Sequence, residues 1–262
     1  MIRIKLQNNI GSFEVGGGGH KIAQLKEIAG IGFLAREKTS VTFPGTAGET
    51  ITDIRDSTRT ITMSFDFYAE PFKVEQLYRM LYQPVEILIF RNGDYRRKII
   101  GQCFTSTDIQ NIIFHRWQSI VLQFHCSNPY FSDIEDTTTD ISAAVENRGD
   151  IEVYPVITVT NTRENNGTGS SYTLTITNNT TNKSIRLLRR LNNDDTFIFD
   201  FPKRKISSQK YGTITKQISD DTMLSDLFLA LGSNSLTVSS SDASDVLNAA
   251  VVHNNNYISA VI

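Results

Sequence analysis

The chain has 262 residues, of which 39% are hydrophobic and 21% are charged, and its formal net charge is −2. These proportions allow a packed core and exclude global disorder. The near-neutral charge gives no reason to expect nucleic acid or an anionic membrane as the partner of the whole surface. The length fits one large domain or two ordinary ones. Residues 1–132 carry 15 Lys and Arg against 12 Asp and Glu, and residues 133–262 carry 11 against 16, which suggests two separately composed units.

The two cysteines, Cys103 and Cys126, are too few for a disulfide framework. The sequence shows no basic segment followed by an apolar one, as a signal peptide requires. It also has no apolar run of the roughly 20 residues that a membrane-spanning helix needs. We therefore expect the chain to fold in a cytosol with both thiols reduced, and we expect the cysteines to serve as small buried apolar residues.

The first 47 residues predict one strand followed by irregular structure. Residues 1–6 alternate apolar and basic side chains, which predicts a strand. Residues 16–19 are four consecutive glycines, which predict a loop because glycine loses much entropy inside a regular element. Residues 21–47 are punctuated by glycine and proline and predict a long arm or loop with short strands.

The clearest strand pattern in the chain is at residues 60–68. Ile61, Met63, Phe65 and Phe67 alternate there with polar side chains. Because successive side chains of a strand point to opposite faces, the pattern predicts one buried face and one exposed face.

The next segment, residues 72–82, predicts a short amphipathic helix. Val74, Leu77 and Leu81 recur at the spacing of one helix face. Pro71 stands near the start, where its missing N–H does no harm, and Pro84 follows the end.

Three further strands complete the first half. Residues 85–90 are apolar, and the Asn92-Gly93 pair after them favours a tight hairpin turn. Residues 95–103 form the returning strand. Residues 119–126 alternate again and predict another strand with one apolar face.

A change of composition marks a boundary within residues 132–150. Residues 133–140 are polar and rich in threonine, and residues 141–150 end in an Asn-Arg-Gly-Asp turn. We therefore divide the chain into residues 1–140 and residues 141–262.

The second half predicts a β-sandwich. It consists of short apolar runs separated by Asn, Gly, Ser and Asp, which is the spacing of sandwich strands and turns. These runs are residues 153–159, 172–176, 197–201, 236–238 and 257–262. One short helix is predicted over residues 223–230.

No arrangement of residues predicts catalysis, a metal or a cofactor. The glycine tract lacks the Lys-Ser/Thr pair of a phosphate-binding loop. None of the four histidines stands at a known metal-ligand spacing, and His125 and Cys126 are adjacent in a strand and point to opposite faces. No Gly-x-Ser-x-Gly occurs. Acidic residues are plentiful, so an acidic pair of the glycosidase type stays open, although solvated turns account for most such pairs.

Two surface features allow alternative interpretations. The second half is rich in Asn and contains His253, which a sugar-binding site could use, but its Asn residues are equally explained by turns, and the only tryptophan is Trp117 in the first half. Basic clusters at residues 96–98, 189–190 and 203–205 could meet acidic partners or subunits, or could protect edge strands by their charge.

In their order, these elements resemble the distal tail proteins of siphophages, the Dit family, and their relatives in prophages and phage tail-like particles. The resemblance covers nearly the whole chain. It is carried by residues 60–68, 72–82, 92–93, 128–131, 149–157, 197–201 and 231–236. The strand start at Tyr154-Pro155 and the Leu-Gly-x-Asn turn at residues 231–234 are the more specific parts. One departure is at residues 30–48, where a proline-rich loop is expected and only Pro44 is present.

The resemblance implies a mainly β protein with an N-terminal β-sandwich-type ring domain carrying one α-helix, followed by a C-terminal galectin-like β-sandwich. The first domain would join five copies in a hexameric ring at the tip of a phage tail, with a central channel for DNA, and the second would lie outside the ring. The implied partners are the tail tube protein, the tail-associated hub or lysin and the tape measure protein. In some relatives the outer domain carries receptor-binding proteins. Assembly in the bacterial cytoplasm and a final place in the virion follow.

We assign assembly to the first half because a long, glycine-punctuated segment such as residues 16–48 is usually functional in a compact domain. The residues expected at contacts between subunits or with partners are Asn92, Gly93, Arg96, Arg97, Phe43 and Pro44. Two functions of different classes follow from the sequence: a structural, non-enzymatic ring component of a phage tail, and a carbohydrate-binding module for attachment to a host surface.

Overall fold

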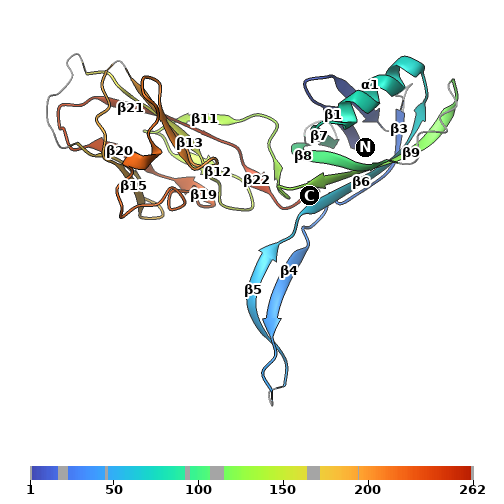
Figure 1. The fold of residues 1–262 in the computed structure, drawn as a ribbon, viewed down its shortest axis with the longest axis horizontal. Coiled ribbons are helices and arrows are strands. Elements are labelled where there is room, and N and C mark those ends of the chain that lie inside the picture. The colour runs from blue at the N-terminus through green and yellow to red at the C-terminus, as the bar shows by residue number, and fades with distance from the viewer. Residues whose placement is uncertain are drawn as a thin grey trace. The chain divides into compact units, whose positions relative to one another are not determined.

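The computed structural model describes residues 2–16, 23–44, 47–91, 95–106, 115–163, 172–193 and 195–260. Over these residues the chain is mainly β, with the single α-helix α1 (Pro71–Leu81). It divides into two compact units (Figure 1), of which the first comprises Met1–Ile134 and Tyr257–Ile262 and the second comprises Glu135–Asn256. The sequence predicted a division into residues 1–140 and 141–262. In the structure the C-terminal residues instead return to the first unit.

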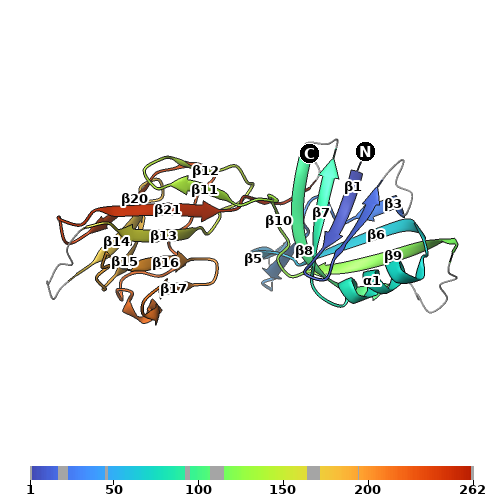
Figure 2. The ribbon, with the colours of Figure 1, turned by 90° about the horizontal axis from the view of Figure 1, so that it is seen from above.

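The first unit is built on a closed, barrel-like sheet of seven strands (Figure 2). In sheet order these strands are β8 (Tyr95–Ser106), β7 (Val85–Arg91), β1 (Ile2–Gln7), β2 (Ser12–Gly16), β3 (Ala23–Ala29), β6 (Arg59–Tyr68) and β9 (Trp117–Cys126). Pairing of β9 with β8 closes the sheet. Two short strands, β10 (Phe131–Ser132) and β22 (Asn256–Tyr257), continue it beyond β8.

The closed sheet differs from the sandwich that the family resemblance implied for this half, and a bulge in β8 explains the closure. The first part of β8 pairs with β7, up to the pair of Gly101 with Val85, and the second part pairs with β9. The register shifts between Cys103 and Thr105, where a bulge bends the strand. The two parts of β8 therefore pair with different strands, β7 and β9, and the sheet closes on itself. The alternation of apolar and polar residues is the same in a barrel as in a sandwich, so sequence periodicity could not distinguish them.

The core of the first unit confirms the predicted strand and helix patterns. Ile61, Met63, Phe65 and Phe67 of β6 are all fully buried, and the polar residues between them point outward. The apolar face of α1 packs into the same core. The side chain of Asn8, in the turn between β1 and β2, donates to the carbonyl oxygen of Met80 at 2.9 Å, which fixes the helix at the end of the barrel where this turn lies.

Arg59, at the start of β6, is a buried cation in the first unit. Its guanidinium donates to the carbonyl oxygens of Gly30 at 2.5 Å, Ile258 at 2.7 Å, Pro129 at 2.7 Å and Gly32 at 2.9 Å. It also lies 4.6 Å from the ring centroid of Phe131. Because a buried charge is tolerated only when its hydrogen bonds are satisfied, Arg59 binds the returning C-terminal segment to the barrel.

The second unit has two sheets that share one apolar core. The larger sheet, in order, contains β11 (Thr137–Asp140), β21 (Leu247–His253), β13 (Val156–Asn161), β16 (Thr196–Asp200), β17 (Lys205–Ser208) and β18 (Gly212–Thr213). The smaller sheet contains β15 (Lys183–Leu187), β14 (Leu174–Asn178) and β20 (Leu236–Ser240). A separate pair is formed by β12 (Val145–Asn147) and β19 (Gly232–Asn234), and a 3-10 turn, η2, spans Thr215–Gln217.

The helix predicted over residues 223–230 is wrong, because these residues form turns and an isolated bridge. Buried side-chain amides bind the backbone of this segment and hold its irregular course. Asn178 donates to the carbonyl oxygen of Phe228 at 2.7 Å, and Asn147 donates to that of Leu229 at 3.2 Å. The apolar residues of this segment therefore pack into the core from irregular backbone.

Both cysteines are free, as predicted. Cys126 is fully buried and Cys103 is half-buried. Burial raises the pKa of the Cys126 thiol to about 11, so this side chain acts as a small apolar group.

We predict that Phe65→Ala lowers the free energy of unfolding of the first unit by about 3–5 kcal/mol, because it empties a fully buried aromatic site. Thr62→Ala, on the outward face of β6, is the control and should cost less than about 1 kcal/mol. Urea titration followed by the fluorescence of Trp117, the only tryptophan in the chain, reports on the first unit. Equal losses in the two variants would contradict a strand with one buried face.

We predict that Arg59→Met destabilises the first unit by about 3 kcal/mol or more, because it leaves several buried carbonyl groups without a donor. Amide hydrogen exchange of residues 257–260 should accelerate in the same variant. Arg79→Met, at an exposed position of α1, should change stability by less than about 1 kcal/mol. Unchanged exchange at residues 257–260 would show that Arg59 does not hold this segment.

Candidate assembly surface

A two-stranded hairpin projects from the first unit (Figure 1). Its strands, β4 (Arg36–Val41) and β5 (Thr50–Asp56), pair with each other and join no other described strand. The sequence predicted an arm with short strands over part of this segment, and the structure shows an extended hairpin.

Apolar side chains are exposed on both faces of the hairpin. Ile51 is 50% exposed and Ile54 is 54% exposed, and the strand register places them on the same face as Lys38 and Ser40. Val41 lies on the opposite face and is also exposed. An isolated two-stranded hairpin is marginally stable in water, and neither face of this one packs on the core of the unit. The hairpin therefore has the character of a surface that a second protein covers.

The base of the hairpin is anchored to the first unit. The hydroxyl of Tyr130 donates to Asp56 at 2.6 Å, and Arg36 forms an ion pair with the same carboxylate at 3.0 Å. Burial and the hydrogen bond to Asp56 raise the pKa of Tyr130 to about 12, so the phenol stays protonated and keeps donating. The backbone N–H of Ser57 also donates to the carbonyl oxygen of Ala35 at 3.1 Å. These contacts hold the direction in which the hairpin leaves the barrel.

The structure places the predicted contact residues on different elements. Phe43, which is 56% exposed, and Pro44 follow β4 on the hairpin. Arg96 is exposed on β8. Asn92 and Gly93 lie outside the described residues.

Arg97, the sixth predicted contact residue, is engaged within the first unit. Its side chain is only 11% exposed and donates to Asp133 at 2.8 Å. Its guanidinium lies 3.5 Å from the ring centroid of Tyr257. Arg97 therefore helps to hold the returning C-terminal segment.

The sequence analysis missed exposed apolar residues on the outside of the barrel. Ile100 and Phe104 of β8 and Trp117 and Val121 of β9 are all exposed there. Phe104 stands at the bulge that closes the sheet. The available signal was the presence of apolar residues at positions of these strands where the alternation predicts polar ones. Exposed apolar area of this kind marks interaction surfaces.

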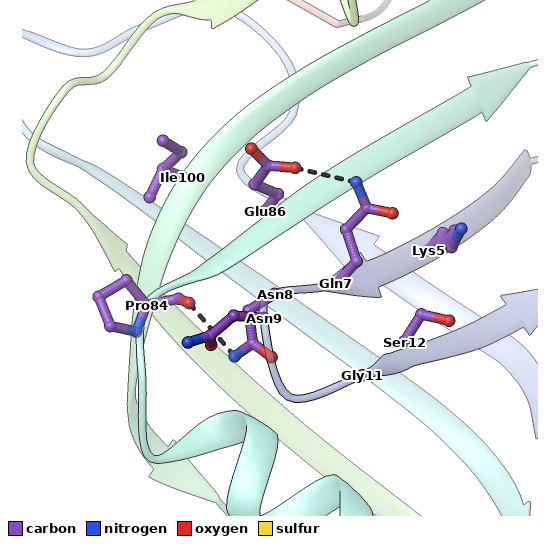
Figure 3. Close-up of a pocket in the computed structure, with 9 residues that line it drawn as sticks. All are labelled: Lys5, Gln7, Asn8, Asn9, Gly11, Ser12, Pro84, Glu86 and Ile100. Carbon is purple, nitrogen blue, oxygen red and sulfur yellow. Dashed lines mark hydrogen bonds between the residues drawn. The ribbon is translucent and has the colours of Figure 1, made fainter.

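A polar hollow of about 710 Å³ lies beside the turn between β1 and β2 (Figure 3). Figure 3 shows the side chains of Gln7 and Glu86 pointing toward each other, with 2.9 Å between the amide nitrogen and the carboxylate oxygen. Asn8 turns toward the carbonyl oxygen of Pro84 at 3.4 Å. Glu86 and Lys5 are the ionisable side chains of the lining, and the carboxylate of Glu86 accepts a hydrogen bond from Gln7.

The second unit contains a compact cluster of charged side chains. Asp242 forms ion pairs with Arg163 at 2.9 Å and with Arg190 at 3.0 Å. Asp245 accepts hydrogen bonds from the hydroxyl of Tyr172 at 2.7 Å and from the amide of Asn161 at 3.0 Å. Both carboxylates of this cluster thus bind side chains from distant parts of the chain.

The electrostatics of this cluster are those of a structural network. Hydrogen bonds from Ser244 and the contact with Arg190 hold the pKa of Asp242 well below its usual range. Burial raises the pKa of Asp245, but the hydrogen bonds it accepts outweigh burial and keep that pKa below its usual value. Burial and the bond to Asp245 raise the pKa of Tyr172. Near neutral pH both carboxylates are ionised, and neither holds a proton to donate.

No group of three or more His, Cys, Asp or Glu side chains among the described residues is arranged to hold a metal ion. None of the described helices has the length and hydropathy that crossing a membrane requires.

Comparison with known proteins shows the fold at low sequence identity. No protein-family model and no curated protein sequence matches the chain. Solved structures do match it, and those described here are from phage tail hubs and baseplates. The fold is therefore that of phage distal tail and baseplate proteins.

One such structure is the Dit protein of phage SPP1, described as a paradigm of the hub adsorption apparatus in phages that infect Gram-positive bacteria. The TM-score is 0.70 at 14% identity, over 98% of this chain and 99% of that one. A chain of the phage P2 baseplate, in its activated conformation with calcium, matches with a TM-score of 0.55 at 8% identity, over 96% of this chain and 98% of that one. The strontium form of the same baseplate gives the same values. The predicted resemblance to distal tail proteins is confirmed at the level of the fold.

We predict that the second unit loses stability as the pH falls from about 5 to about 3. A carboxyl group whose pKa is lower in the folded state stabilises the fold above its unfolded pKa, near 4, and this contribution is lost as the pH falls toward the folded value. Asp242→Asn should lower stability near neutral pH and flatten this dependence. Hydrogen exchange of β14 and β16 in the full chain measures it. An equally steep pH dependence in the variant would show that Asp242 is not responsible.

Proposed function

We propose that the chain is a structural component of a phage tail tip or baseplate. In this proposal six copies form a ring that joins the tail tube to the tail-associated hub or lysin and leaves a central channel for DNA. The ring-forming part lies within residues 1–140, and a galectin-like sandwich lies within residues 141–262. The observation that carries the proposal is the hairpin β4–β5, which exposes apolar side chains on both faces.

The hairpin supports assembly because its geometry suits a contact between unlike surfaces. A projecting element that a neighbour covers differs from the surface that receives it, so the contact is heterologous. Heterologous contacts end in a closed ring or continue as a filament. The apolar surface around Ile100 and Phe104 is one candidate for the receiving side. The match over nearly the full length of both chains to the SPP1 protein, which is described as a paradigm of a hub adsorption apparatus, supports a place at a tail tip.

The remaining parts of the proposal follow from this role. The protein would act without catalysis or cofactor, because the densest charged cluster is a structural network. Its partners would be further copies of itself, the tail tube, the hub or lysin and the tape measure protein, with receptor-binding proteins on the outer unit. It would assemble in the bacterial cytoplasm and remain in the virion at the tail tip.

Light scattering of the purified full chain tests the ring. The expected mass is about six times the 29.4 kDa of one chain. We predict that the double variant Ile51→Lys and Ile54→Lys weakens association at least about tenfold, or 1.4 kcal/mol, and shifts the mass toward the monomer. Both residues are exposed in the single chain, so its fold should be retained.

A matched control introduces the same charges elsewhere. Met223→Lys with Leu231→Lys replaces two exposed apolar residues of the second unit and should leave the mass unchanged. A ring that survives the hairpin substitutions would place the interface elsewhere. A wild-type chain that is monomeric at micromolar concentration would refute the ring itself.

A further inference from the structure

The second unit carries an acid-free run of positive charge. Residues 135–256 contain 11 Lys and Arg against 15 Asp and Glu, a net charge of −4. Residues 203–216 nevertheless contain five Lys and Arg and no Asp or Glu. A net charge of +5 over fourteen residues, within a unit that is negative overall, is a local concentration of cations.

The fold brings a further cation to these residues. The backbone N–H of Ile206 donates to the hydroxyl of Thr215 at 2.8 Å, which holds Lys205 near the segment that carries Lys216. Arg189 donates to the side chain of Gln217 at 3.2 Å, next to Lys216 in sequence.

An aromatic contact ties the same arginine to the turn between β17 and β18. The guanidinium of Arg189 lies 4.0 Å from the ring centroid of Tyr211, and Lys210 is the adjacent residue. The strands on either side of this turn, β17 and β18, are the last two of the larger sheet, and Figure 2 shows β17. We define the basic strip by its members, Arg189, Arg204, Lys205, Lys210 and Lys216.

Of the acids that flank the basic strip in the chain, Asp195 and Asp200 are engaged, and Asp220 is exposed four residues after Lys216. Asp200 pairs with Lys203 at 2.9 Å, outside the strip. Asp195 is buried and accepts from the hydroxyl of Ser208 at 2.6 Å. Over the described part of the chain, no ion pair involves Arg204, Lys205 or Lys216. These three exposed side chains therefore present their charge outward.

Arg204 has an unusual backbone. Its φ angle is 51°, in the left-handed region that favours glycine. The preceding turn closes through its N–H, which donates to the carbonyl oxygen of Phe201 at 3.1 Å. A long cationic side chain at a strained position is a reason to look for a functional contact there.

The strip suits a flexible polymer with repeating anions. A single exposed cation–anion contact contributes little and is screened by salt, so useful affinity needs several contacts along one chain. The ammonium groups of lysine act as point charges that bind phosphate without a fixed geometry. An acidic protein segment would also need apolar anchors. The only exposed large apolar side chain in residues 203–216 is Tyr211, one face of which Arg189 covers.

We propose that the basic strip binds a polymer of polyol or sugar units linked by phosphate groups, of the kind carried on bacterial cell surfaces. The setting of this contact, a tail tip at the host surface, rests on the proposed function. The contact itself is a property of the second unit.

Binding of the full chain to immobilised poly(glycerol phosphate) tests the proposal. Wild-type protein should bind, and its affinity should fall steeply between about 50 and 300 mM salt. The double variant Lys205→Gln and Lys216→Gln should bind at least about tenfold more weakly than wild type, and its affinity should depend less steeply on salt concentration. Both side chains are exposed, so folding should be unaffected.

The control variant Lys183→Gln with Arg148→Gln removes the same charge from exposed positions of the same unit, and it should change affinity less than about twofold. Equal losses in the two variants would show a response to net charge and overturn the strip. Equal affinity for poly-L-glutamate would assign the strip to an acidic protein, and tighter binding of duplex DNA would assign it to nucleic acid. Either result overturns the proposal.

Light scattering of the same samples separates this inference from the ring. Wild-type protein that forms the ring and does not bind the polymer would overturn the basic strip alone. Monomeric wild-type protein that binds it would overturn the ring and support the strip.

Discussion

The first unit depends on a buried guanidinium. Arg59 carries a charge that the apolar core would reject unless its N–H groups were satisfied, and the groups that satisfy it are four carbonyl oxygens from three separate segments of the chain. One of these belongs to Gly30, whose φ of 83° and close approach to the carbonyl oxygen of Thr60 exclude a side chain. The loop before the hairpin, the segment after β9 and the C-terminal return are therefore held at one point. The hairpin starts and ends close to this point in the chain, so the contacts of Arg59 add to those of Tyr130 and Arg36 with Asp56, which hold its direction.

In the second unit, side-chain amides and carboxylates hold irregular segments of the chain in position. Asn147, Asn178 and Asn234 are buried and bind backbone groups of the irregular segment before β19. Asp242 and Asp245 bind arginine, tyrosine and asparagine side chains that lie 52 to 84 residues away in the sequence. In both places, hydrogen bonds from polar side chains hold irregular backbone in position. The basic strip lies near β17 and β18, the last two strands of the larger sheet.

The two units differ in what they leave uncovered. The first exposes apolar residues on a projecting hairpin and on the outside of its barrel, which favours association with protein. The second exposes positive charge near the edge of its larger sheet. This charge opposes edge-to-edge pairing of strands and favours an anionic partner. In the proposed function, the first property would serve assembly and the second would serve contact with the surroundings of the particle.

Local periodicity determined much of the fold from the sequence alone. The buried face of β6, the helix α1 and most strands follow from side chains two to four residues apart, because secondary structure depends on such short spacings. Phe43 and Pro44 lie on the segment that the sequence predicted to be an arm. The pairing of β4 with β5 into a hairpin was not predicted. Only tertiary structure decided the closure of the sheet at the bulge of β8, the absence of a helix at residues 223–230, and the engagement of Arg97 within its own unit. Each of these depends on partners far away in the sequence, which no local pattern records.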